Sequence, residues 1–454
     1  MASTVLKVSL TPAPPAWQGW YVVFVLSIAS IVSFIDRQII NLLVDPIKLD
    51  LGISDFQISL LQGFAFALFY AVLAIPLAWI SDRYNRKMVI LFGLVCWSAA
   101  AFASGLASIF MVLFVARMFI GVGEATLAPA GMSMISDMFT KEKLPGPISV
   151  YVGSGFVGSG LALTVGGYLY SLLEAAGPQA LAFGTFAPWQ LTFFAVAALS
   201  VPVFLMLLTI AEPVRRDDST ALPTDEAPPA FEVLAFLKSK AALLIPLIIG
   251  FSCFSAAQFG IGAWAPSYFI RVHGWSQLEV GTYFGPVVIV SGVAGVVLSG
   301  FVAERLLGRG VRDATLRLPI MAIVLAVPFA IAFPLVASPW LALALLAVVL
   351  FLGTVPFGAG VSTFPLITPN RMRAQVIAAY LLVANLLGYS AGPILVAWLT
   401  DNVFGDPDLI NLSLATAPVG MMVIGVILIF IARGPFLRHA AFDDAAEIAN
   451  NSKI

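Results

Sequence analysis

The sequence has little charge and few reactive side chains. Only 10% of its 454 residues are Asp, Glu, Lys or Arg, the formal net charge is −1, and there are two cysteines and two histidines. A chain without excess positive charge is not expected to bind nucleic acid, and so few Cys and His residues predict neither a disulfide scaffold nor a metal site. We find no nucleophile elbow or phosphate-binding loop. The sequence therefore predicts neither an enzyme nor a need for a cofactor.

Long apolar runs make up most of the chain instead. Apolar side chains account for 60% of the residues and the mean hydropathy is +1.00, more than a soluble globular chain of this length carries. A bilayer core of about 30 Å takes roughly 20 apolar residues per helix. The sequence therefore predicts an all-α membrane protein with twelve transmembrane helices, at residues 20–43, 56–80, 88–106, 109–138, 146–172, 189–210, 241–270, 281–303, 317–337, 340–366, 373–400 and 414–434.

Lys and Arg are distributed unevenly over the connectors. When the amino terminus is placed in the cytoplasm, 19 of the 23 basic residues fall on the cytoplasmic side. Lys48 and Arg271 then fall outside, and Arg37 and Arg117 fall within the membrane. Because basic residues concentrate in cytoplasmic loops, this alternation supports twelve spans. It predicts a multi-pass protein of a cytoplasmic (inner) membrane with both termini in the cytoplasm.

The longest connector, residues 211–240, is rich in Pro, Asp and Glu. It separates a first bundle of six helices (1–210) from a second bundle with a tail (241–454), and its end, 231–240, is predicted to form a short amphipathic helix. The loop AWISDRYNRK after the second span and the loop GFVAERLLGRG after the eighth share an acidic residue followed by Arg. We therefore expect two pseudo-symmetric bundles with a substrate site between them, as in many secondary transporters.

Four charged residues lie within the apolar runs. Asp36 and Arg37 are adjacent in the first run, and Arg117 and Glu124 are seven residues apart in the fourth, on one face of a helix. A charge at membrane depth costs on the order of 2.5 to 3.5 kcal/mol on insertion scales, so it is kept when it is paired or lines an aqueous path. We predict proton coupling by Asp36 and Glu124 and substrate binding by Arg37 and Arg117. The alternative is that the four charges only hold the first and fourth predicted helices together as ion pairs.

The second half carries no charge in its predicted helix interiors. Its candidates for a binding cavity are polar or aromatic residues, namely Gln258, Tyr268, Tyr283, Ser362, Thr363, Tyr380, Asn385 and Tyr389. One charged half and one apolar, weakly polar half suit a substrate with a polar head and a long tail. In the first half, small residues are predicted to allow close helix packing at Gly153, Gly155, Gly158 and Gly160.

The loop after the second span resembles the signature of the major facilitator superfamily, Gly-x-x-x-Asp-Arg-x-Gly-Arg-Arg/Lys. Ala78 and Asn85 stand where that pattern has glycine. The segments FIDRQ, DRYNRK, ARMFIGVGEAT, VGSGFVGSGLALTVGGY and ANLLGYSAGP resemble the Spinster branch of the superfamily. The resemblance implies a proton-linked carrier of amphiphilic lipids. It also implies a cytoplasmic gate, as opposed to a loop that only sets topology, formed by Asp82, Arg83, Arg86 and Lys87.

The sequence thus predicts a proton-coupled, alternating-access secondary transporter of an amphiphilic small molecule such as a lysolipid or sphingolipid-like compound. Its expected partners are this substrate, protons and membrane lipids, and we expect a monomer. A proton-coupled carrier of small organic anions or drugs is the alternative. A membrane receptor or scaffold would need a sizeable soluble domain, and no connector exceeds about thirty residues.

Overall fold

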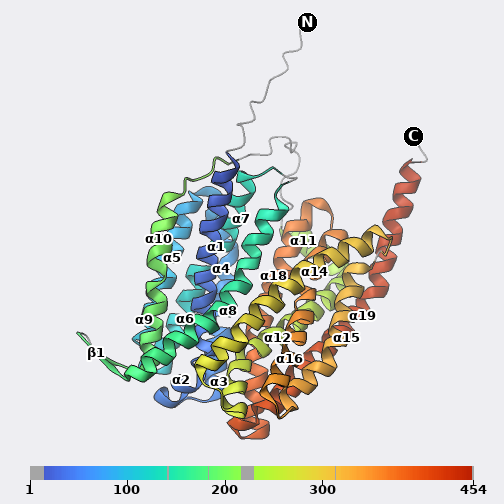
Figure 1. The fold of residues 1–454 in the computed structure, drawn as a ribbon. Coiled ribbons are helices and arrows are strands. Elements are labelled where there is room, and N and C mark those ends of the chain that lie inside the picture. Colours follow the sequence, from blue (N-terminus) through green and yellow to red (C-terminus); the bar gives the residue numbers. More distant parts are fainter. Residues whose placement is uncertain (1–14, 141–142, 183, 216–229, 312, 452–454) are drawn as a thin grey trace.

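The computed structural model describes residues 15–140, 143–182, 184–215, 230–311 and 313–451. Within these residues, twelve helical segments are long and apolar enough to cross a membrane. They form two bundles, one from each half of the chain, which are drawn in blue to green and in yellow to red in Figure 1. The predicted all-α fold of twelve spans in two six-helix bundles is confirmed.

The first half supplies six spans and a short hairpin. Its elements are α1 (Ala16–Gln38), η1 (Ile39–Asn41), α2 (Val44–Leu51), α3 (Asp55–Ser59), η2 (Leu60–Phe64), α4 (Ala65–Arg83), α5 (Arg86–Gly105), α6 (Phe110–Glu124), α7 (Leu127–Met138), α8 (Pro145–Ala176), β1 (Gln179–Leu181), β2 (Gly184–Phe186), α9 (Pro188–Ala198) and α10 (Ser200–Thr209). The pairs α6–α7 and α9–α10 each make one span, and α3, η2 and α4 together make the second span.

The second half begins with a short helix in the connector, where the sequence predicts one. Its elements are α11 (Ala230–Ser239), α12 (Ala241–His273), α13 (Gln277–Glu279), η3 (Val280–Phe284), α14 (Gly285–Gly308), α15 (Ala314–Ala332), η4 (Phe333–Leu335), α16 (Pro339–Gly353), α17 (Val355–Thr363), η5 (Phe364–Leu366), η6 (Asn370–Met372), α18 (Arg373–Trp398), η7 (Leu399–Phe404), η8 (Pro407–Leu409) and α19 (Ile410–Asn451). Residues 216–229 of the predicted linker lie outside the described residues.

The two bundles meet at one end and diverge toward the other (Figure 1). We call the end at which α1 begins and α19 ends the terminal side, and the opposite end, which carries α2 and α3, the distal side. The bundles come together toward the distal side, and their ribbons separate toward the terminal side. The region between them is therefore where residues of both halves can act on one substrate.

The second and eighth spans show the pseudo-symmetry in detail. The second span starts with a capping box in which Ser54 and Gln57 each accept the other's backbone N–H, at 3.2 and 3.1 Å. The eighth span starts with the same arrangement between Ser276 and Glu279. In both spans the capped turn leads into a five-residue π-helix, η2 or η3. A capping box satisfies two backbone donors at a helix start, so the two halves begin corresponding spans by the same means.

Glycines in α8 bring this helix close to both bundles. A Cβ atom on Gly158 would lie 2.7 Å from the Cβ of Phe34, and one on Gly160 would lie 2.3 Å from Ile289 of α14. Gly155 is equally restricted by Phe34, at 2.8 Å. The predicted packing role is confirmed for these three, whereas a Cβ on Gly153 would meet nothing within 4 Å. The prediction was wrong for Gly153 because its side of the helix is open.

Candidate functional site

The four charged residues within the apolar spans lie together, two at the end of α1 and two in the second half of α6. Asp36, Arg37, Arg117 and Glu124 are all buried. Arg37 Nε donates to Glu124 Oε2 at 3.1 Å, and Arg37 Nη2 forms an ion pair with the same oxygen. The sequence grouped the charges as Asp36 with Arg37 and Arg117 with Glu124. The structure pairs them differently, because Glu124 of the neighbouring helix α6, and not the adjacent residue Asp36, accepts the hydrogen bonds of Arg37.

Arg117 is engaged by backbone and not by a carboxylate. Its guanidinium donates to the carbonyl oxygens of Leu61, Asp36 and Arg37 at 3.2, 3.0 and 2.9 Å, and its side chain is 0% exposed. The carbonyls of Asp36 and Arg37 lie at the carboxyl end of α1, where acceptors lack intrahelical partners, and that of Leu61 lies in the π-helical turn η2. Arg117 therefore holds α1 and the second span against α6.

The Asp36 carboxylate is buried without a hydrogen-bond partner among the described residues. The residue is 1% exposed, and neither carboxylate oxygen meets a hydrogen-bond donor in the described part of the chain. Glu124 Oε1 is also buried, and no described residue donates a hydrogen bond to it. Since burial of an unpaired charge is strongly unfavourable, these oxygens are the places in the cluster where a proton would relieve the cost.

Arg37 also reaches the second half of the chain. Its Nη1 donates to the hydroxyl of Tyr389 in α18 at 2.9 Å. The guanidinium carbon lies 4.7, 4.1, 5.3 and 5.3 Å from the ring centroids of Phe34, Phe66, Tyr70 and Tyr389 respectively. Aromatic faces stabilise a cation at such distances. Tyr389 was predicted, whereas Phe34, Phe66 and Tyr70 were not, because an aromatic residue in an apolar run reads as ordinary packing.

Tyr268 and Tyr283, two other predicted binding residues, lie away from this cluster. Tyr268 is buried near the distal end of α12, where its hydroxyl donates to the Phe333 carbonyl at 2.9 Å and lies 2.8 Å from His273 Nε2. Tyr283 is exposed in η3 and packs edge-on against Trp340. Neither residue is joined to Arg37 or Tyr389 by a contact among the described side chains.

The remaining candidates lie in α12, α17 and α18 of the second half. Tyr380 is buried and stacks on Phe364, with 4.4 Å between ring centroids. Ser362 donates to the Gly358 carbonyl within its own helix, and Thr363 is fully buried. Asn385 is half-buried on α18, and Gln258 carries a buried amide oxygen without a hydrogen-bond partner in the described residues. The ring of Tyr389 lies on Phe259, at 3.9 Å between centroids, and all of these residues are aromatic or uncharged.

The predicted gate residues divide into two groups on the terminal side. Asp82 and Arg83 are exposed at the end of α4, with the Arg83 guanidinium 3.9 Å from the Trp79 ring, and the Asp82 carboxylate has no ion pair or hydrogen bond within the described residues. Arg86 is instead 1% exposed. It forms an ion pair with Asp137 and donates to Glu212 Oε1 at 2.8 Å.

Arg86 and Lys87 thus connect elements of the first half. Besides its ion pairs, Arg86 donates to Ser133 and to the carbonyl of Pro213. Lys87 Nζ donates to the Leu208 carbonyl at 2.8 Å. These bonds join the start of α5 to α7 and to the end of α10. In this conformation both residues stabilise the first bundle internally, and none of their described bonds crosses to the second.

A charged network on the distal side joins the two halves, and the sequence did not predict it as a site. Arg271, at the end of α12, donates to Asp45 Oδ1 at 2.8 Å and to both oxygens of Asp55, at 2.7 and 2.9 Å. Lys48 adds an ion pair to Asp55 at 2.5 Å. Asp55 is fully buried. The sequence places Lys48 and Arg271 only in outside loops. That these two are the basic residues assigned to the outside was the signal that could have indicated a common site.

Three further described hydrogen bonds join the halves, one of them from the Thr164 hydroxyl of α8 to the Gly281 carbonyl of η3 at 2.9 Å. Asp401 of η7 accepts the backbone N–H of Phe56 at 2.7 Å, which caps the start of α3 from the other half. The Gln62 amide donates to the Ala263 carbonyl at 3.0 Å. The described polar links between the halves therefore lie on the distal side and at the level of the charged cluster.

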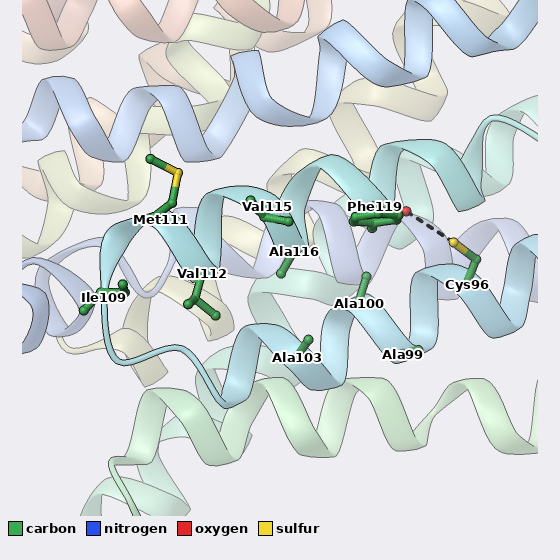
Figure 2. A pocket seen from close by; sticks show the side chains of 10 residues that line it. All are labelled: Cys96, Ala99, Ala100, Ala103, Ile109, Met111, Val112, Val115, Ala116 and Phe119. Atoms are coloured by element: carbon green, nitrogen blue, oxygen red, sulfur yellow. Dashed lines mark hydrogen bonds between the residues drawn. The ribbon is translucent and has the colours of Figure 1, made fainter.

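Three apolar grooves of the described structure lie elsewhere. Figure 2 shows one between α5 and α6, with a volume of about 570 Å³, in which the Cys96 thiol lies 3.8 Å from the Phe119 carbonyl oxygen. A second is formed by α14 to α17 and a third by α5, α9 and α10. None of these grooves is lined by the charged cluster, so the cluster, not groove size, identifies the candidate site.

Twelve spans in two pseudo-symmetric bundles, with a buried ion pair at their contact, define a membrane transporter of small molecules. Residues 26–393 match the family model of the Major Facilitator Superfamily. The chain belongs to the major facilitator superfamily, whose members among the relatives found are transporters and not enzymes.

Individual relatives cover nearly the whole chain. An efflux pump of Mycolicibacterium smegmatis is 26% identical over 93% of this chain and 94% of its own. A sphingosine-1-phosphate transporter of Danio rerio is 24% identical over 84% of this chain and 75% of its own. A crystal structure of a bacterial homologue of the human lysosomal transporter Spinster, inward-facing and unoccupied, has a TM-score of 0.76 at 25% identity and covers 94% of this chain and 98% of its own. The predicted resemblance to the Spinster branch is confirmed.

Proposed function

We propose that the protein is a proton-coupled, alternating-access transporter of an amphiphilic anion, such as a lysolipid or sphingolipid-like molecule. The observation that supports this most directly is the placement of Arg37. It is a buried cation at the contact of the two halves, paired with Glu124 on one side and Tyr389 on the other. The zebrafish relative, a sphingosine-1-phosphate transporter by name, supports a lipid with an anionic head.

Coupling follows from competition for Arg37. An anionic headgroup that accepts two hydrogen bonds from the Arg37 guanidinium weakens the ion pair between Arg37 and Glu124, because the same N–H donors serve both acceptors. The released carboxylate is then buried without a partner, and a proton removes its charge. Asp36 is already in that position. We therefore assign proton exchange to Asp36 and Glu124, headgroup binding to Arg37, and positioning of α1 to Arg117.

The apolar tail is assigned to the uncharged second half. Tyr389 of α18 packs on Phe259 of α12, and Tyr380, also in α18, stacks on Phe364 of η5. Burial of a methylene group in such surroundings contributes about 0.8 kcal/mol. The head at Arg37 and the tail along these rings would place one substrate against both halves. We propose a monomer because this site is complete within one chain.

We assign the terminal side to the cytoplasm of an inner membrane, with both termini there, from the distribution of Lys and Arg. The described links between the halves are distal or at the cluster. This conformation is therefore interpreted as closed outside and open to the cytoplasm, and the inward-facing relative of similar fold supports it.

The substrate assignment is tested by transport and binding with a series of lysolipids of one headgroup and increasing chain length. The protein is reconstituted in liposomes with an inward or outward pH gradient. Affinity should rise with each methylene, by up to roughly fourfold per group if each contributes about 0.8 kcal/mol, and transport should require the gradient. A flat dependence on length, with strong competition by small water-soluble carboxylates, would contradict the lipid assignment.

The alternative is a carrier of small organic anions or drugs, in which Arg37 binds a carboxylate directly. The mycobacterial relative, an efflux pump by name, favours it. In that case Tyr380→Ala, which removes a buried ring from the second half, should leave transport of the small anion unchanged. The lipid assignment predicts that the same variant loses affinity for long-chain lysolipids and little for short ones.

A prediction for the gate concerns Asp82. Its carboxylate is exposed and has no ion pair or hydrogen bond among the described residues, and we propose that its gating contact forms in the state closed on the terminal side. Asp82→Asn should therefore leave the melting temperature unchanged and raise the population open on that side, because a change shifts an equilibrium only through a differential contact. Spin labels at Tyr84 and Leu366, both exposed, measure this separation. Asp408→Asn on the distal side is the control, and an unchanged distance distribution in Asp82→Asn would favour a loop that only sets topology.

A further inference from the structure

A small β-hairpin extends from the distal side of the first half. Strands β1 and β2 pair antiparallel, with Ala180 opposite Thr185, and join the distal ends of α8 and α9. In Figure 1 the hairpin projects sideways beyond α9, at the far left of the view. It is therefore outside the bundle and beside it, not beneath it in the path between the halves.

The base of the hairpin is fixed, while its strands are open. Phe186 is buried and packs edge-on against Phe194, with 5.1 Å between centroids. Trp189, just after the hairpin, donates its indole N–H to Asp50 of α2 at 2.8 Å. All of β1 and the first two residues of β2 are exposed, and Leu181 is 42% exposed. The hairpin is thus held in a defined direction with apolar groups on its surface.

Its composition does not suit bulk water. The chain has no Asp, Glu, Lys, Arg or His between Glu174 and Glu212. Natural proteins protect exposed strand edges with charges, especially Lys, and a two-stranded hairpin alone in water is marginally stable. This hairpin lacks the charges. It is equally unsuited to the hydrocarbon core, where open strand edges would leave backbone groups unsatisfied.

Aromatic residues also gather on the distal side of the second half. Trp340 opens α16 at its distal end, is 55% exposed, and lies 4.7 and 5.5 Å from the rings of Tyr283 and Trp275. Trp and Tyr gather at the level of lipid headgroups. Since the hairpin leaves the distal ends of spans on the other half, it extends from the bundle toward this boundary layer.

We propose that the β1–β2 hairpin lies in the headgroup layer of the distal leaflet and anchors the first half to the bilayer. In that layer water satisfies the strand edges, and the upper acyl chains cover Leu181. An uncharged hairpin gains nothing from anionic lipid, so its contact is with the layer itself and independent of salt. The anchor sits at the end of α8, the helix that packs against both α1 and α14, so it holds the first bundle while the second moves.

The test uses a fluorophore sensitive to polarity at Leu181→Cys in a Cys96→Ala, Cys253→Ala background. The full protein is reconstituted in phosphatidylcholine vesicles. The emission of the fluorophore should be blue-shifted relative to the same fluorophore in buffer without detergent. Lipids that carry a spin label at the top of the acyl chain should quench it several-fold more than aqueous iodide does. Adding phosphatidylglycerol or salt should change neither. The exposed distal residue Asp408, changed to Cys, is the matched control and should show the reverse quenching.

Two outcomes would overturn the proposal. Strong iodide quenching at position 181 with no effect of labelled lipid would place the hairpin in water. Efficient disulfide formation between Leu181→Cys copies, or quenching between copies that rises with protein density, would mean that a second chain covers the hairpin. Both results are independent of whether the substrate is a lipid or a small anion, because no substrate is present.

Discussion

Asp36→Asn is expected to abolish accumulation driven by a pH gradient while the protein remains folded. The native carboxylate is buried with no described donor, so an amide of the same shape removes a site for a proton without breaking a bond. Its stability should be unchanged or higher, since an unsatisfied buried group costs about 1–3 kcal/mol. Uptake with a pH gradient, and exchange of substrate at equal pH on both sides, are measured in the same liposomes. Exchange should persist and gradient-driven uptake should fall to the level seen without a gradient.

Glu124→Gln tests the other acid, and its expected result differs. It removes the ion pair of a buried Arg37, and loss of one partner of a buried pair costs on the order of 3–5 kcal/mol. Transport should again be uncoupled, but with a lower melting temperature. Glu174→Gln, on the exposed end of α8, is the control and should behave as the wild type. If Asp36→Asn still accumulates substrate with wild-type pH dependence, Asp36 carries no coupled proton. If both variants only unfold, the four charges serve to hold the helices together and do not carry a coupled proton.

The fold was predictable because the bilayer sets a length and a composition for each span. Every predicted span has a counterpart, although several observed helices are longer, such as α19, predicted to span 414–434 and observed over Ile410–Asn451. Hydropathy detects the apolar part of a helix and not its polar ends. The break between α6 and α7, directly after Glu124, was not predicted. The run remains apolar through it, so periodicity gives no signal there.

The sequence predicted which residues form the candidate site better than it predicted which of them contact one another. A charge in an apolar run stands out, which identified Asp36, Arg37, Arg117 and Glu124. Which charge meets which depends on helix packing, and so the Arg37–Glu124 pair and the backbone acceptors of Arg117 came only from the structure. The charged network on the distal side was not predicted, because Arg271 is 216 residues from Asp55 in the chain. A single sequence offers no measure of contacts between residues so far apart in the chain.

Arg271→Ala is expected to open the distal side. Arg271 holds Asp55 by a two-pronged contact and Asp45 by a third bond, so one residue of the second half binds two carboxylates of the first. These bonds exist only while the distal ends are together. Removing the cation leaves Asp55 buried with Lys48 as its remaining ion pair. At about 3 kcal/mol for the loss of a buried partner, the ratio of distal-closed to distal-open protein should fall by roughly a hundredfold.

The change is measured as a distance between the halves. Spin labels are placed at Leu49 in α2 and at Asp408, both exposed on the distal side, in a background without Cys96 and Cys253. Arg271→Ala should convert a short distance into a longer one, and Arg271→Lys should give an intermediate population because Lys cannot form the two-pronged contact. Arg317→Ala is the control, since its ion pair with Asp313 lies within the second half. An unchanged distance in Arg271→Ala would mean that helix packing, and not this network, keeps the distal side closed.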